Sequence, residues 1–430
     1  MKKILVIGGG FAGLTSSVFL SNKNFKVTLL ESSPKFGGRA YSILNTKQKS
    51  FYDNGQHIMM GCYKDTLDFL SIINSRDLLD IPSSLSINFV KRGGELALLK
   101  ASQYHYPFNL VKAILNFKGL RTKSRIKIID FFLDLLCCYS CDLKNKTVIM
   151  WLKEKKQTEE SIKYFWEILV VGALNTTIEK ASALIFAEIL KRIFFDGNQS
   201  ATIVISKVGL TELYVEPSIK FLTEKGSELK LSEKVTKFET DGNKIVRVLT
   251  EKNIYENFDY IVSAIPTYAL SRILENSKIK SLPIPNLEYS PILNVHLWLE
   301  NNPFTEAFYG LLVSHIHWIF NRGDHISITI SSAESLMNCS DEEILDLIYS
   351  DLEIFFPIFK PSLVKDFKVI KEKRATFIPD ISSVYNREEI NSPFDNLLLA
   401  GDWTNSFLPA TIESAVLSAK QVLDKILEKQ

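Results

Sequence analysis

The chain has 430 residues, a length that allows two or three domains, and 46% of them are hydrophobic, which is enough for large cores. Its 51 basic and 49 acidic residues leave a net charge of +2, so the overall charge does not indicate a nucleic-acid partner. The apolar run at the amino terminus is too short for a secretory signal, and no apolar run is long enough to cross a membrane. We therefore expect a cytoplasmic protein that is soluble or bound peripherally to a membrane.

The beginning of the chain has the pattern of a dinucleotide-binding βαβ unit. Residues 2–7 predict a strand, which leads directly into Gly8-Gly9-Gly10-Phe11-Ala12-Gly13. A helix is expected to about residue 22, and a second strand over 26–30 ends at Glu31. In a GxGxxG fingerprint the glycines allow a tight turn and a close approach of the backbone to a pyrophosphate, which rests on the amino terminus of the helix.

Glu31 and the glycine turn that follows narrow the cofactor to FAD. Glu31 lies 18 residues after Gly13, a spacing that suits a carboxylate accepting a hydrogen bond from a ribose 2′-hydroxyl and disfavours the 2′-phosphate of NADP. Gly37 and Gly38 predict a turn, and Arg39 follows them. An ordinary turn needs no arginine, whereas a second segment passing a pyrophosphate gains from a cation.

A second block of the same kind closes the chain. Residues 396–402 predict a buried strand that ends in Gly401 and Asp402, and an amphipathic helix begins at about Ile412, just after Thr411. Because a strand again leads to a helix amino terminus, we expect this block to contact phosphate or ribityl groups. A carboxylate at Asp402 suits the ribityl hydroxyls.

These patterns predict an α/β protein with a discontinuous Rossmann-like domain. Strands expected over 235–239, 244–249 and 258–266, with a hairpin turn at Asp241-Gly242, join the two end blocks. The FAD-binding domain is therefore expected to comprise residues 1–75, 201–266 and 391–430. A mixed α+β substrate-binding domain is expected from 76–200, predicted to be largely helical, and from 267–390, where strands accompany a helix over 341–355.

The five cysteines do not have the spacing of a metal site. Cys138 and Cys141 form a CxxC inside an apolar helical stretch, but no second pair of thiols or histidines accompanies them. We expect no metal, and we interpret the cysteines as buried structural thiols in a reducing cytosol.

One predicted helical region is strongly basic. Six Lys and Arg residues and no acid lie from Lys112 to Lys127, interleaved with apolar side chains. This pattern suits a helix that lies on an anionic membrane surface, and it suits equally the solvated face of a helix packed on its own core.

The motifs resemble the flavin amine oxidase and phytoene desaturase superfamily and, within it, the squalene-associated FAD-dependent enzymes, the hydroxysqualene dehydroxylases. The chain departs from the usual pattern at Ser17 and lacks a glycine expected near Ser418. The narrower resemblance rests on segments in family order over most of the chain: Tyr52-Asp53-Asn54-Gly55-Gln56-His57, Leu174-Asn175-Thr176, Leu213-Tyr214-Val215-Glu216-Pro217, Trp318-Ile319-Phe320-Asn321-Arg322-Gly323, Gly401-Asp402-Trp403-Thr404 and Leu408-Pro409-Ala410-Thr411-Ile412-Glu413.

The resemblance implies an amine-oxidase-like fold and removal of the allylic hydroxyl of hydroxysqualene, with reduced flavin as the hydride donor. The segment after the glycine turn would then run beneath the flavin ring, so Asp53, Gln56 and His57 are the first catalytic candidates. His57 titrates in the range useful for a proton donor, although Asp53 also suits a turn cap and His57 a core histidine. Arg322 is expected to bind the substrate hydroxyl or a flavin carbonyl, or to form an ordinary salt bridge. Val235 is expected to contact adenine through its backbone.

Three other functions stay open on this fold. A carotenoid desaturase would use the flavin in the oxidising direction, an amine oxidase would need an aromatic cage, and a prenyl-chain carrier would need no flavin chemistry. The intact fingerprint favours an enzyme with a polyprenyl or triterpenoid substrate. Because only one dinucleotide fingerprint is present, the electron donor is not identified.

Overall fold

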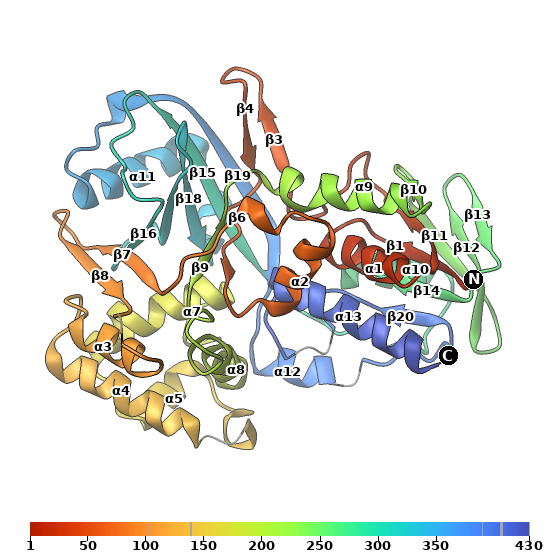
Figure 1. Ribbon diagram of the computed structural model, residues 1–430, viewed down its shortest axis with the longest axis horizontal. Coiled ribbons are helices and arrows are strands. Elements are labelled where there is room, and N and C mark those ends of the chain that lie inside the picture. The colour runs from red at the N-terminus through yellow and green to blue at the C-terminus, as the bar shows by residue number, and fades with distance from the viewer. Residues whose placement is uncertain (103, 138–139, 389, 405–406, 430) are drawn as a thin grey trace.

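A parallel five-stranded sheet forms the end of the molecule that holds both termini (Figure 1). The computed structural model describes residues 1–102, 104–137, 140–388, 390–404 and 407–429. The sheet order is β10-β2-β1-β14-β20, so segments far apart in the chain lie side by side. Its strands are β1 (Lys3–Ile7), β2 (Lys26–Leu30), β10 (Glu228–Lys230), β14 (Tyr260–Ser263) and β20 (Leu397–Leu399).

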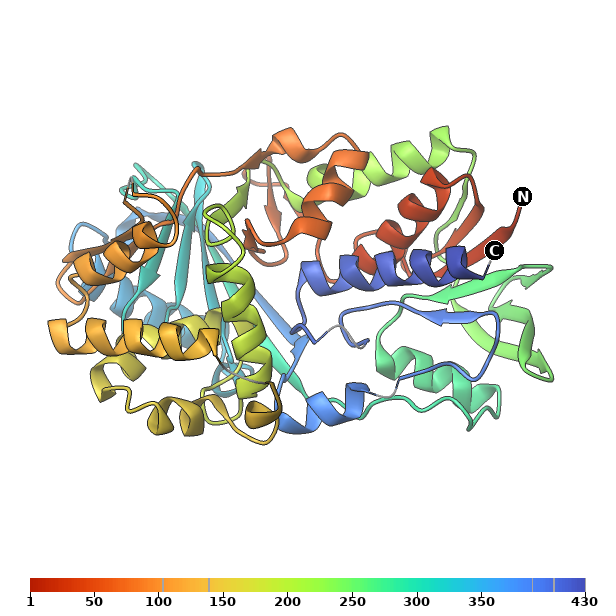
Figure 2. The same ribbon diagram turned by 60° about the horizontal axis from the view of Figure 1, so that its bottom comes forward.

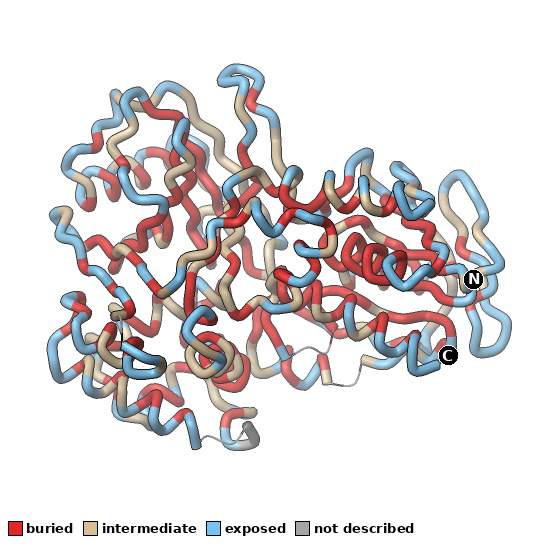
Figure 3. The backbone as a smooth tube through the Cα atoms, viewed as in Figure 1, coloured by how far each residue is buried: buried red, intermediate tan, exposed pale blue. Residues whose placement is uncertain are grey.

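Both faces of this sheet are covered, which explains why its strands are nearly continuous apolar runs. On one face, Ile4 and Val6 pack against α1 (Phe11–Asn22) and α13 (Ile412–Glu428), which lie side by side in Figure 2. On the other, Leu5 and Ile7 face α10 (Thr267–Asn276) and an antiparallel sheet of β11 (Val235–Asp241), β12 (Lys244–Thr250) and β13 (Ile254–Glu256). Figure 3 shows β1 and α1 almost entirely buried.

The other half of the molecule is built on a seven-stranded sheet of order β19-β15-β18-β17-β16-β7-β8. Helix α11 (Asp341–Phe355) packs on one face and closes a core of β15 and β18 side chains. The strands are β7 (Ser86–Val90), β8 (Leu96–Lys100), β15 (Tyr289–Leu299), β16 (Phe308–Leu311), β17 (Trp318–Asn321), β18 (His325–Ser331) and β19 (Val364–Phe377).

A layer of helices packs against a separate core beside this sheet (Figure 1). These helices are α3 (Phe108–Asn116), α4 (Thr122–Leu136), α5 (Val148–Glu154), α6 (Glu159–Ser161), α7 (Glu167–Leu174) and α8 (Ala183–Phe194). The remaining elements are shorter, and two of them, α2 (Lys64–Ile72) and α9 (Glu216–Glu224), pack on α13 and α1. The others are β3 (Ser42–Asn45), β4 (Ser50–Asp53), β5 (Met59–Met60), β6 (Leu79–Asp80), β9 (Ile203–Ser206) and α12 (Ile381–Glu388).

The α/β class and most predicted elements are confirmed, and two expectations are wrong. The region 76–200 is largely helical as predicted, although residues 86–100 form the hairpin of β7 and β8, whose alternating burial marks a half-exposed sheet edge. The basic region is two helices, since α3 ends at Asn116 and α4 begins at Thr122. Cys137 is exposed rather than buried, while Cys138 lies outside the described residues.

The proposed domain boundaries stay a prediction. The strands of the five-stranded sheet do come from the three segments assigned to the FAD-binding domain. Helix α10, assigned to the other domain, packs on β11 and shares its core, so the boundary at residue 266 divides a packed unit. Within the described ranges, no helix has the length and apolarity needed to cross a bilayer.

Candidate active site

A cavity of about 980 Å³ runs from the carboxyl ends of β1 and β2 to the space between the helices and the seven-stranded sheet. All but three of the predicted cofactor-binding and catalytic residues line it. The exceptions are Gly13, Asp53 and Arg322. The predicted residues that line it are Gly8, Gly10, Phe11, Ala12, Glu31, Gly37, Gly38, Arg39, Gln56, His57, Val235, Gly401, Asp402, Thr411 and Ile412.

The GxGxxG turn is packed so tightly that a side chain at its third glycine has no room. A Cβ at Gly13 would lie 1.7 Å from the carbonyl oxygen of Gly8. Gly8 itself has a φ of +103°, which L side chains rarely adopt. At Gly10, by contrast, a Cβ would be 3.7 Å from its nearest non-neighbouring atom, the Cα of Gly38, so this glycine leaves open space toward the cavity.

The amino terminus of α1 fits an anion. Its N-cap residue, Gly10, has no side chain to cap the helix, its first turn has no acid, and Gly10, Phe11 and Ala12 line the cavity. Uncapped N–H groups and the helix dipole together favour a phosphate at this point. The Glu31 carboxylate accepts hydrogen bonds from the Gly9 N–H at 2.6 Å and the Ser33 N–H at 2.8 Å, so it is held in place beside the turn. This geometry fits the pyrophosphate and ribose of FAD.

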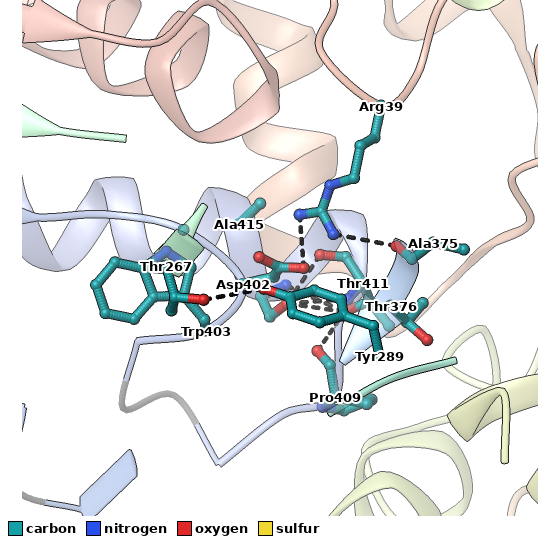
Figure 4. Close-up of polar contacts among 12 residues, drawn as sticks. Arg39, Thr267, Tyr289, Ala375, Thr376, Asp402, Trp403, Pro409, Thr411 and Ala415 are labelled. Carbon is teal, nitrogen blue, oxygen red and sulfur yellow. Dashed lines mark hydrogen bonds and ion pairs between the residues drawn. The ribbon is translucent and has the colours of Figure 1, made fainter. Parts of the chain in front are cut away.

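Two residues assigned to different parts of FAD lie in contact. Arg39 donates to the Asp402 carboxylate at 2.7 Å and to the carbonyl of Ala375 at 3.0 Å (Figure 4). The contact joins the glycine turn to the loop after β20, across the wall of the cavity. That Arg39 contacts the pyrophosphate and Asp402 the ribityl chain stays a prediction.

The loop after β20 is held by two residues that sequence reasoning did not assign. Buried Arg387 donates to the carbonyl oxygens of Asp402, Trp403 and Thr404. Ser418, at the place where a glycine was expected, accepts a hydrogen bond from the Gly401 N–H at 2.8 Å. Where a glycine would allow the helix backbone to pack closely on the loop, the Ser418 hydroxyl instead forms a hydrogen bond with the loop at Gly401. The only sequence signal for Arg387 was a cation upstream of β20.

We expect Arg387→Met to weaken FAD binding about tenfold or more, because three buried carbonyls would lose a charged donor. The measurement is the dissociation constant of FAD from refolded apoprotein, followed by flavin fluorescence. Tyr385→Phe on the same helix is the control, since its exposed hydroxyl bonds only to Asn145 among the described residues. Equal affinities in the two variants would contradict the assigned role of Arg387.

The segment predicted to lie beneath the flavin ring does border the cavity. Asn54, Gly55, Gln56 and His57 line it, and a Cβ at Gly55 would be 2.9 Å from the side-chain nitrogen of Asn294. Asn294 lies on β15, lines the cavity and accepts a hydrogen bond from the Thr329 hydroxyl at 2.9 Å. It is a polar residue of the cavity wall that the sequence did not single out.

Asp53 and Arg322 hold the backbone instead of facing the cavity. Asp53 is buried and accepts hydrogen bonds from the Leu210 N–H at 2.9 Å and the Ser42 hydroxyl at 2.7 Å. Arg322 donates to the carbonyls of Ser206 and Val208. Both side chains thus secure the chain around β9, and the geometry favours a positioning role for them over direct contact with the reacting atoms.

His57 does not titrate in the range expected from the sequence. Burial, reinforced by the nearby positive charge of Arg39, lowers its pKa from 6.5 to about 4. The ring is therefore neutral at pH 7, so it can donate a hydrogen bond into the cavity but does not carry the extra proton of an imidazolium. The expectation that His57 has an ordinary pKa is therefore wrong, while a catalytic role for His57 stays a prediction.

This shift predicts how the stability of the apoprotein depends on pH. Because the folded pKa lies below the unfolded one, the unfolded chain binds the proton first as the pH falls from 6.5 toward 4, and the free energy of unfolding decreases over that window. At pH 5 the loss relative to pH 7 is on the order of 1–2 kcal/mol from this histidine. Urea unfolding should show a smaller decrease in His57→Gln than in the wild type. An unchanged decrease would place the pKa of His57 near its ordinary value.

The far part of the cavity, which we call the apolar arm, is lined by side chains from α3, α7, α8, β7 and β17. They include Phe89, Leu110, Ile114, Leu169, Ile189 and Phe320. Gln56 and His57 line the same cavity as the arm, so a long apolar ligand placed in it would share one space with the flavin-binding residues.

Fold and cavity together define an FAD-dependent oxidoreductase. A family model described as flavin containing amine oxidoreductase matches residues 11–427, and the chain belongs to that family. The chain is 24% identical over 425 residues to the hydroxysqualene dehydroxylase of Zymomonas mobilis, covering 98% of both chains. It is 23% identical to the 15-cis-phytoene desaturase of Synechococcus elongatus, covering 100% of this chain and 96% of the relative.

Solved structures share the fold at lower identity. An oxidoreductase from Methanosarcina mazei aligns with a TM-score of 0.74 at 15% identity, over 98% of this chain and 100% of that one. Putrescine oxidase bound to putrescine aligns with a TM-score of 0.71 at 13% identity, over 99% of both chains. The predicted superfamily, its fold and the FAD cofactor are thus confirmed.

Proposed function

We propose that this protein removes the allylic hydroxyl of hydroxysqualene reductively, giving squalene and water. The observation that carries the proposal is the single cavity of about 980 Å³ in which the FAD-binding residues and the apolar arm are continuous. An arm lined by apolar side chains suits a polyprenyl chain and excludes water from the reacting carbon. The similarity to three hydroxysqualene dehydroxylases at 23–24% identity supports this substrate.

The chemistry requires a hydride and a proton. Reduced FAD would supply the hydride. Overall, the substrate carbon gains the hydride, and the hydroxyl takes up one proton and leaves as water. In this proposal neutral His57 and the side chains of Gln56 and Asn294, which line the cavity, orient the hydroxyl by hydrogen bonds. The apolar arm keeps water away from the allylic cation that develops as the hydroxyl leaves.

An anaerobic single turnover tests the proposal. Dithionite-reduced holoenzyme, freed of excess dithionite, is mixed with hydroxysqualene while flavin absorbance is followed and squalene is extracted. Flavin reoxidation with one squalene formed per flavin supports the dehydroxylase. A flavin that stays reduced, with no squalene formed, contradicts it.

A desaturase is the second candidate, because the similarity to a 15-cis-phytoene desaturase also spans the whole chain. The same apolar arm would hold a carotenoid precursor, but the flavin would be reduced by the substrate. Oxidised holoenzyme mixed with phytoene distinguishes the two: bleaching of the flavin with a new conjugated product supports the desaturase.

We also propose a peripheral membrane contact through α3 and α4. Phe108 and Ile126 are 69% and 50% exposed, and Lys118 and Lys123, which lie between them in the chain, are also exposed. Ile114, on the same helix as Phe108, lines the apolar arm, so a bilayer at this surface would adjoin the arm. Sedimentation with anionic vesicles should fall in Phe108→Ser relative to the wild type. Equal sedimentation of both proteins would contradict the contact.

A further inference from the structure

A line of polar side chains lies on one face of the seven-stranded sheet and leads from the cavity toward the protein surface. On one face of the paired strands β15 and β18, Asn294 lies opposite Thr329, and His296 lies opposite Ser327. His325 lies on the same face of β18, two residues before Ser327. We call these five residues the polar stripe.

The stripe has one end at the cavity and the other at the surface. Asn294 and Thr329 line the cavity. At the opposite end, the Nδ1 atom of His325 is 2.7 Å from the carboxylate of Asp324, whose side chain is 47% exposed. Between the two ends, His296 and Ser327 are completely buried.

The middle of the stripe is polar but has no partners within the described chain. Both ring nitrogens of His296, the Nε2 atom of His325 and the hydroxyl of Ser327 are buried and make no hydrogen bond of normal geometry to a described residue, although the Asp53 backbone approaches the His296 ring. The ring centroids of the two histidines are 5.5 Å apart. Buried polar atoms are normally paired with protein or with bound water, and leaving one unpaired is costly. Four such atoms in a row therefore call for a function or for a chain of waters.

The groups that surround the stripe keep its histidines neutral. Burial and the neighbouring His325 lower the pKa of His296 to about 3, while an approach of the Asp53 backbone opposes the shift and Arg322 adds to it. The ring of Tyr52, on β4, lies beside the His296 ring with their centroids 4.9 Å apart. Lys368 is the residue of β19 that lies opposite His296 in the sheet. A neutral imidazole accepts a proton at one nitrogen and releases one from the other.

We propose that the polar stripe conducts protons between Asp324 at the surface and the cavity, with bound water bridging its buried side chains. The inference rests on the proposed function for its purpose, since the departing hydroxyl consumes one proton and His57 is neutral. Transfer leaves the net protonation of the stripe unchanged: each proton that enters at the Asp324–His325 end is matched by one delivered at the Thr329 end, and the reverse holds for a proton that leaves the cavity. Neighbours along one strand are about 7 Å apart at i and i+2, a gap that one water spans.

A substrate-free measurement tests the stripe separately from the dehydroxylase reaction. Reduced holoenzyme is mixed anaerobically with at least two equivalents of ferricyanide, which together take two electrons from the flavin, one each, and leave its proton to be released. Stopped-flow absorbance follows flavin oxidation, and a pH-indicator dye follows the appearance of that proton in solvent. In the wild type the two signals should coincide.

We expect proton release to lag flavin oxidation at least tenfold in His296→Leu and in Asp324→Asn, with the rate of flavin oxidation unchanged. Asp324→Asn covers the case in which the buried substitution prevents folding. His317→Asn is the control, because His317 accepts a hydrogen bond from the Ser331 N–H outside the stripe. Coincident signals in both stripe variants would overturn the proposal. A lag in these variants together with no squalene from the wild type would keep the stripe and reject the substrate.

Discussion

Gly13→Ala is expected to destabilise the apoprotein by about 3 kcal/mol or more, and to abolish FAD retention. The added Cβ would lie 1.7 Å from the Gly8 carbonyl oxygen, and that oxygen belongs to backbone that cannot turn aside. Relief requires α1 to move away from β1, which would shift the helix amino terminus that faces the cavity. Urea unfolding of the apoprotein and the flavin content of the purified protein measure the two effects.

Gly10→Ala is the matched substitution, because it adds the same methyl group three residues earlier. Here the Cβ has ordinary contact distances, and the φ of −83° suits alanine, so the stability of the apoprotein should change by no more than about 1 kcal/mol. The methyl group would instead occupy the approach to the pyrophosphate and weaken FAD binding about tenfold or more. If both variants lose stability equally, the two glycines do not have the separate roles assigned here.

The FAD-binding half was predictable because its information is local. A strand, a glycine turn, a helix and an acid follow one another within 31 residues, and each step has its own physical signature. The structure places these elements as β1, α1 and β2, and the hairpin at Asp241-Gly242 follows equally from its turn residues. Even the absence of a glycine near Ser418 was visible, although its consequence, a bond to Gly401, was not.

The catalytic candidates were less predictable, because the sequence does not specify which side of a segment faces the cavity. Asp53 and His57 are four residues apart in one motif, yet Asp53 binds Leu210 and Ser42 while His57 lines the cavity. Asn294 comes from a strand more than 230 residues later and meets Gly55 only through the pairing of the two halves. The pKa of His57 also depends on burial, which no local pattern reveals.

The apolar arm gives the second large effect, and Leu169→Glu is expected to abolish binding of the hydrocarbon while FAD is retained. Leu169 is half-buried on α7 and lines the arm, so the new carboxylate would lie where the polyprenyl chain is proposed to pack. A ligand that forces a carboxylate out of water loses about 3 kcal/mol or more, equivalent to at least about a hundredfold in the dissociation constant of squalene.

Val171→Glu separates this effect from a general loss of stability. Val171 is two residues along the same helix and half-buried to a similar degree, but it does not line the cavity. Squalene presented in detergent micelles is titrated into both holoenzyme variants, and binding is followed by the perturbation of the flavin spectrum. Loss of binding in Leu169→Glu alone would locate the hydrocarbon in the arm. Equal binding in the two variants would mean that the chain lies elsewhere, because a carboxylate inside the arm and a bound hydrocarbon cannot share that space without a measurable cost.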